Sequence, residues 1–178
     1  MSARCVWRGA KRYGIIRHMN QNLKTTLKTW PAVAALTIGL CFLTQRAAAL
    51  LGIELPDQQN VEVVRQWLTH AFDSAKNLAT CAILLAQVLV LLPAAEEAIF
   101  RLPTRWLRGR AWWVLSSALF SAAHYLAQPF PDSAFIALFF FGLAQCWLYK
   151  KTNRLWCAML NHGLFNLTNV ALLLLLPS

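Results

Sequence analysis

The sequence predicts an all-α, polytopic transmembrane helix bundle with about five spans and a cytoplasmic N-terminus. Three observations support this prediction. Of the 178 residues, 58% are hydrophobic and only 13% are charged, whereas about 25% of the residues of soluble domains are charged. Five apolar segments approach the length that crosses a bilayer. The connections between them alternate in charge. A soluble globular domain, a disordered chain and a disulfide-rich scaffold all fit this composition poorly.

The five predicted spans are separated by polar connections. A bilayer core of about 30 Å is crossed by about 20 mostly apolar helical residues, and each segment is close to that length. Arg46 lies near the far end of the first segment, from where its long side chain can reach the interface. The segments comprise residues 30–51, 78–100, 111–127, 133–149 and 155–176.

The connections predict the orientation, because Lys and Arg collect on the cytoplasmic side of membrane proteins. Residues 1–29 carry seven basic and no acidic side chains, and 101–110 and 150–154 are also basic. By contrast, 52–77 carries four acidic and two basic residues, and 128–132 carries a single aspartate. The order is therefore in, out, in, out, in, with the C-terminus outside.

This distribution also accounts for the formal net charge of +10, so we expect the lipid bilayer as a partner and no nucleic acid. Residues 1–29 are interpreted as a basic cytoplasmic leader rather than a cleaved signal peptide. Residues 30–178 are interpreted as a single transmembrane domain. The five cysteines include no CxxC pair, which argues against a disulfide framework and a zinc–thiolate site.

Segment 53–75 is long for a connection. Its apolar residues recur at helical spacing, which favours a short amphipathic helix on the outer surface. A solvated loop with one helical turn is an equally good interpretation. The apolar positions are Val61, Val64, Trp67, Leu68, Ala71 and Phe72.

Four ionisable side chains lie inside or at the end of apolar segments, where such groups are costly and point to function. Glu96 and Glu97 follow an uncharged run of 18 residues, and His124 and His162 lie within later segments. Pro93 precedes the acidic pair. It removes a backbone donor and favours a kink there, although membrane helices also tolerate proline without any functional role.

Helical spacing groups these side chains with polar neighbours, because residues four apart share a helix face. Glu97 can pair with Arg101, and His162 can share a cavity with Asn166. Glu96 lies about 100° around the helix axis from Glu97, so it can stay available for chemistry while Glu97 is held by the arginine.

These groups suit amide hydrolysis by water. A carboxylate in an apolar pocket is a better base near neutral pH, a neighbouring histidine can orient the water, and a histidine and an asparagine can stabilise an oxyanion. Three alternatives remain: structural contacts within a non-catalytic membrane protein, a zinc site made by one glutamate and two histidines, and a proton relay in a small transporter. HExxH is absent, and asparagine is an uncommon zinc ligand, so no cofactor is expected.

Three motifs resemble those of a known family. Residues 96–101 match EExxxR, 120–124 match FxxxH and 162–166 match HxxxN. In this order, on separate apolar segments, they resemble the CPBP family of intramembrane proteases, the CAAX protease and bacteriocin-processing group. The resemblance covers about residues 78–170, which would be the catalytic core of a transmembrane protease domain.

The resemblance implies a glutamic intramembrane endopeptidase. Its motif positions give a water-activating pair, an oxyanion-stabilising pair and an ordering pair, namely Glu96 with His124, His162 with Asn166, and Glu97 with Arg101. Larger members have about eight spans, and Leu102 stands where the family often has glycine. The implied substrate is a membrane-anchored or exported protein, and the implied location is the cell membrane, the inner one in a Gram-negative host. The family also includes bacteriocin-immunity proteins, which supply the non-catalytic alternative.

Overall fold

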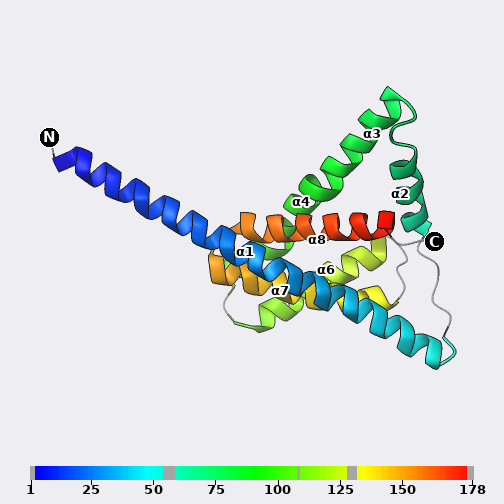
Figure 1. Ribbon diagram of the computed structural model, residues 1–178. Coiled ribbons are helices and arrows are strands. Elements are labelled where there is room, and N and C mark those ends of the chain that lie inside the picture. The colour runs from blue at the N-terminus through cyan, green and yellow to red at the C-terminus, as the bar shows by residue number, and fades with distance from the viewer. Residues whose placement is uncertain (1–2, 54–58, 108, 128–131, 176–178) are drawn as a thin grey trace.

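The structure, a computed structural model, describes residues 3–53, 59–107, 109–127 and 132–175 (Figure 1). All regular elements in these ranges are helices, which confirms the predicted all-α fold. The elements are α1 (Ala3–Leu50), α2 (Gln59–Thr69), α3 (Ala75–Ala86), the π-helical turn η1 (Gln87–Leu91), α4 (Leu92–Arg101), α5 (Pro103–Trp106), α6 (Ala111–Ala127), α7 (Asp132–Thr152) and α8 (Leu155–Leu175).

Three helical segments of the described chain are long and apolar enough to cross a membrane: Ile16–Leu50, Ala75–Trp106 and Leu155–Leu175. They overlap the first, second and fifth predicted spans. The third and fourth predicted spans form α6, which has 17 residues, and α7, which has 21 and carries two lysines in its last turn. The chain is thus a helical bundle with the composition of an integral membrane protein.

Helix α1 differs from its predicted boundaries. We expected a leader up to residue 29 and a span from residue 30, but one helix continues through both and through Pro31. Figure 1 shows its N-terminal part projecting away from the bundle, while its second half crosses α7 and α8. Membrane helices tolerate an internal proline, and the 48 residues of α1 form one continuous helix.

The connection between the first two predicted spans contains helix α2, which confirms the helical interpretation of part of segment 53–75. Glu54 and Asp57, which contribute to the predicted outer charge, lie outside the described residues, as do most of the turn 128–132 and the end of the fifth predicted span. The structure therefore leaves the predicted in–out order as a prediction.

The second predicted span departs from α-helical geometry just before Pro93. In η1 the backbone N–H of Leu92 donates to the carbonyl of Gln87, five residues earlier. Continuing this spacing would pair residue 93 with Val88, but proline has no N–H. The amide Nδ2 of Asn166 donates to the Val88 carbonyl instead, at 2.8 Å. A side chain of α8 thus supplies the donor that the proline lacks.

The same turn explains why α8 carries a glycine. A Cβ built on Gly163 would lie 2.3 Å from the main-chain oxygen of Leu89. Only the absence of a side chain allows α8 to approach η1 this closely. Gly163 follows His162 in α8, so this contact also fixes the position of His162 along α8 relative to α4.

An aromatic core joins the helices on the other side of His162. Phe120 and Phe141 are fully buried, and Phe165 packs on Phe141 with ring centroids 4.6 Å apart. The His162 ring lies 4.9 Å from the Phe141 ring and 5.9 Å from the Phe120 ring, both edge to face. This cluster, which also contains Val33 of α1, packs α1, α6, α7 and α8 around the histidine.

We expect Gly163→Ala to destabilise the protein by about 1–3 kcal/mol, because its Cβ must displace the backbone of η1. Gly39→Ala is the matched control, since nothing lies within 4 Å of a Cβ at that helical position. The control should be neutral or stabilise by up to about 1 kcal/mol. Thermal unfolding in detergent measures both, and equal midpoints would contradict the close approach.

Candidate active site

The last two turns of α4 place the acidic pair in different surroundings. Glu97 is fully buried, whereas the side chain of Glu96 is 23% exposed. Adjacent helical residues point about 100° apart, so α4 directs one carboxylate into the bundle and the other toward a partly open space. The structure thus separates the two carboxylates as their helical spacing predicts: Glu97 lies inside the bundle, and Glu96 is partly exposed.

Glu97 and Arg101 form a buried ion pair. The Nε of Arg101 lies 3.1 Å from Oε2 of Glu97, and both side chains are completely buried. Nη1 of Arg101 donates to the hydroxyl of Ser116 at 2.8 Å, and that hydroxyl donates to the Phe100 carbonyl. The guanidinium also lies over the Phe120 ring, 5.0 Å from its centroid. These contacts join α4 to α6.

The second oxygen of Glu97 holds His162. Nδ1 of His162 lies 2.9 Å from Oε1 of Glu97. A carboxylate can only accept, so Nδ1 carries the hydrogen. The other ring nitrogen, Nε2, then faces Glu96 and lies 3.5 Å from its Oε2. Glu97 thus links the arginine of its own helix to the histidine of α8.

His124, on α6, also directs one ring nitrogen toward Glu96. Its Nδ1 lies 2.9 Å from the main-chain carbonyl of Phe120, which can only accept. Nε2 is therefore the nitrogen that faces Glu96, 3.7 Å from Oε1. Glu96 lies between two imidazoles that both turn Nε2 toward it.

The contact between His124 and Glu96 differs from what straight, parallel spans would give. Counted along straight spans, its position about 13 residues into the third segment places it about 20 Å from the level of Glu96. The structure brings the two side chains together. Figure 1 shows α3 and α4 inclined to α8 rather than parallel to it, and this inclination lets α4 and α6 meet at these residues.

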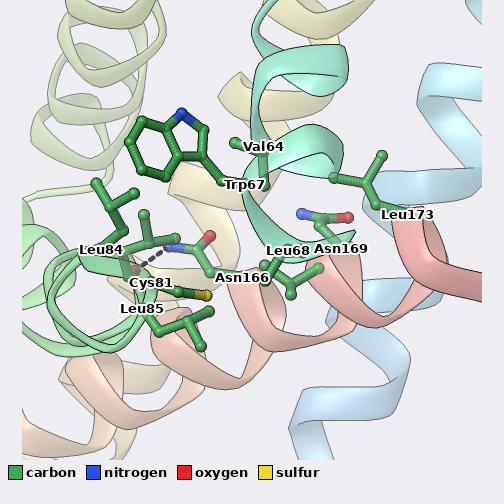
Figure 2. Close-up of a pocket in the computed structure, with 11 residues that line it drawn as sticks. Val64, Trp67, Leu68, Cys81, Leu84, Leu85, Asn166, Asn169 and Leu173 are labelled. Carbon is green, nitrogen blue, oxygen red and sulfur yellow. Dashed lines mark hydrogen bonds between the residues drawn. The ribbon is translucent and has the colours of Figure 1, made fainter. Parts of the chain in front are cut away.

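Asn166 lies one helical turn beyond His162, as its spacing predicts. Its amide donates a hydrogen bond to the carbonyl of Val88 in η1 (Figure 2) rather than to either carboxylate. One amide hydrogen is used in this bond, and an amide nitrogen carries two. The contact orients the amide and leaves a second hydrogen for another acceptor.

Among the described residues, no group of three or more His, Cys, Asp and Glu side chains is arranged to hold a metal ion. The expected absence of a cofactor is not tested by this observation, and it stays a prediction.

Comparison with family models identifies the family of this chain. A model described as type II CAAX prenyl endopeptidase Rce1-like matches residues 77–168, which is more than half of the chain. The chain belongs to the Rce1-like family. All six predicted site residues lie inside the matched range, and the resemblance inferred from the three motifs is confirmed at the family level. Neither the curated proteins nor the solved structures give a significant match.

Membership of the Rce1-like family has general consequences for this chain. The family is one of proteases, which hydrolyse peptide bonds, and it implies a membrane environment and a membrane-associated protein substrate. The apolar helices of the described chain agree with that environment.

Several polar contacts near the site have no counterpart in the sequence prediction. Ser116 accepts a hydrogen bond from Arg101, 15 residues earlier in the chain, and nothing in the sequence distinguishes it from Ser117 and Ser121 of the same helix. Asn161, next to His162, accepts from Gln145 of α7 at 2.9 Å, and its amide donates to the Thr26 carbonyl of α1. An amide in each of two apolar segments was the only available signal.

We expect Arg101→Met to cost about 3–5 kcal/mol of stability, because it leaves the Glu97 carboxylate buried without its charged partner. Arg105→Met is the matched control: Arg105 is exposed one turn further along, and its loss should change stability by less than about 0.5 kcal/mol. Unfolding midpoints in detergent measure the difference. An Arg101→Met protein as stable as the control would show that the ion pair does not hold the bundle.

Proposed function

We propose that this Rce1-like protein is a multi-pass endopeptidase of the cell membrane that uses glutamate to activate water. Its substrate is a membrane-anchored or exported protein. The observation that carries the proposal is the position of Glu96, which lies within 3.7 Å of the Nε2 atoms of His124 and His162. The bonds that fix both rings support the roles expected from the motifs.

We assign the activation of the attacking water to Glu96 and His124. With Nδ1 of His124 donating to a backbone carbonyl, the neutral ring presents an acceptor at Nε2. A water can donate one hydrogen to this nitrogen and the other to Glu96. As the water oxygen attacks the peptide carbonyl carbon, Glu96 takes its proton and later returns it to the leaving amine. The partial exposure of Glu96 and His124, 23% and 24%, admits water and substrate.

We assign the stabilisation of the oxyanion that forms during the attack to His162 and Asn166. Glu97 holds His162 through Nδ1, so Nε2 is the ring nitrogen turned toward Glu96, and we assign this nitrogen the contact with the oxyanion. The second amide hydrogen of Asn166 is the other donor. Both side chains are fixed before the substrate binds, and preorganised donors are the main source of such stabilisation. Glu97 and Arg101 are positioning residues in this scheme.

The bonding of the motif residues also favours one alternative. Glu97, Arg101 and Asn166 all make contacts that hold helices together, which a non-catalytic immunity or scaffold protein would equally need. The two functions differ at Glu96, because only the enzyme requires its carboxylate to accept a proton.

Comparing protein termini in membrane and secreted fractions of cells tests the proposal. Termini that depend on the wild-type protein should fall by on the order of 10²-fold or more in Glu96→Gln, which keeps the shape but removes the base. Asp73→Asn is the control, because it neutralises an exposed acid and should leave the termini unchanged.

The outcome of this comparison separates the two functions and the two mechanisms. Identical termini in wild-type and Glu96→Gln cells, with the variant stable and functional in the host, would support the immunity or scaffold role. For the purified protein and a substrate so identified, we expect a chelator to leave turnover unchanged. Loss of turnover that zinc restores would overturn the glutamic mechanism in favour of a metal.

A further inference from the structure

Eight exposed basic side chains gather at one end of the bundle, and the proposed chemistry uses none of them. Three lie on α1, two lie between α4 and α6, and three lie around the turn that joins α7 to α8. We call this surface the basic end. Its members are Arg17, Lys24, Lys28, Arg105, Arg110, Lys150, Lys151 and Arg154.

Contacts between helices bring the later members of the basic end together. Nζ of Lys150, in the last turn of α7, donates to the main-chain carbonyl of Thr104 in α5. The next residue along the chain is Arg105. In the turn after α7, the backbone N–H of Arg154 donates to the hydroxyl of Thr152 at 3.4 Å. The end of α7, the start of α8 and α5 therefore share one end of the bundle.

Two hydrogen bonds place α1 at the same end. The Asn161 amide of α8 donates to the Thr26 carbonyl at 3.4 Å, and Nε1 of Trp30 donates to the Thr168 hydroxyl at 3.2 Å. The two helices thus run in the same direction. At 1.5 Å per residue, Arg17 lies about 14 Å before Thr26, and α8 begins about 9 Å before Asn161. Helix α1 leaves the bundle beside the first turns of α8 (Figure 1).

No carboxylate balances these charges within the described parts of the chain. None of the eight side chains forms a salt bridge there. Of the acidic residues in those parts, Glu96 and Glu97 belong to the candidate active site. The others lie on α2, before α3 and at the first residue of α7, which is the end opposite its two lysines. The surface therefore attracts anions from outside the chain.

Exposed tryptophans show where this surface lies relative to the bilayer. Trp106, Trp147 and Trp156 are all exposed at the basic end, and Nζ of Lys151 lies over the Trp147 ring, 4.6 Å from its centroid. Tryptophan collects at the headgroup level of a membrane. The basic side chains thus lie at the depth of lipid phosphates, which favours an anionic phospholipid over a nucleic acid in free water.

A groove along α1 has the composition of a headgroup site. It is lined by Ile16, Arg17, Asn20, Gln21 and Lys24. Arg17 and Lys24 are seven residues apart and share one face of the helix, with the two amides between them. Two cations and two amides can donate to the oxygens of a phosphate and its polar headgroup, and Ile16 adds an apolar contact.

We propose that the basic end binds anionic phospholipids of the membrane in which the protein lies, and that the α1 groove between Arg17 and Lys24 is a headgroup site. The inference does not depend on the proposed function. It follows from the charge of this surface and its place beside interfacial tryptophans, and it commits to one occupant, a lipid with a net negative headgroup.

Lipid retention by the purified full-length protein tests the site. Native mass spectrometry from dodecylmaltoside micelles, titrated with phosphatidylglycerol or phosphatidylcholine, gives an apparent Kd for each lipid. The wild-type protein should bind phosphatidylglycerol at least about tenfold more tightly than phosphatidylcholine. The double variant Arg17→Gln/Lys24→Gln should weaken phosphatidylglycerol binding about tenfold and leave phosphatidylcholine binding unchanged.

A second double variant with the same loss of charge is the matched control. Arg46 and Lys76 are exposed at the other end of the bundle, near the end of α1 and the start of α3. Arg46→Gln/Lys76→Gln should therefore keep the wild-type Kd for phosphatidylglycerol. If Arg17→Gln/Lys24→Gln fails to accumulate, Lys151→Gln/Arg154→Gln replaces it, because both of its side chains belong to the basic end and should show the same selective loss.

Three results would overturn the inference. Equal Kd values of the wild-type protein for the two lipids would show that the headgroup charge is not recognised. Equal weakening in the variants of the two ends would assign the binding to net charge rather than to this surface. Tighter binding of a 20-nucleotide RNA than of phosphatidylglycerol, lost in Arg17→Gln/Lys24→Gln, would make the surface a nucleic-acid site. None of these results bears on the Glu96→Gln comparison.

Discussion

The buried ion pair between Glu97 and Arg101 is the constraint on which the rest of the structure depends. Neither side chain is exposed at the protein surface, so each charge needs its partner, because a lone buried charge costs several kcal/mol. Their further hydrogen bonds join Arg101 to Ser116 of α6 and Glu97 to His162 of α8. Three helices must therefore assemble around one side chain of α4. Glu97 and Arg101 make the contacts that hold these helices together. The neighbouring Glu96 is therefore not needed for them, and it lies beside two oriented imidazoles, where it can take part in chemistry.

A second constraint acts on the opposite side of His162. The π-helical turn and Pro93 leave the Val88 carbonyl without a helical donor, and Asn166 supplies one. Gly163 lets α8 come close enough for this bond. The irregular backbone is tolerated because it lies against protein rather than lipid. Consequently the residue assigned to the oxyanion is also a structural donor.

The sequence predicts those parts of the site that depend on spacing within one helix. Glu97 with Arg101 and the placement of His162 one turn before Asn166 follow from i, i+4 geometry, and the composition predicts the all-α fold. Contacts between helices are not predicted in this way. The Ser116 bond, the role of Asn166 at η1 and the meeting of His124 with Glu96 all depend on helix inclination and rotation. These quantities are set by packing between helices, which no local sequence pattern encodes.

Comparing the unfolding midpoints of Glu96→Gln and Glu97→Gln in detergent tests most directly the claim that Glu97 stabilises the fold and Glu96 does not. The account predicts that Glu97→Gln lowers the midpoint markedly, because Arg101 is left buried without a countercharge. It predicts that Glu96→Gln leaves the midpoint at the wild-type value, since this side chain is partly exposed and its nearest imidazole nitrogens are 3.5 and 3.7 Å away. Equal midpoints for the two variants would contradict the account.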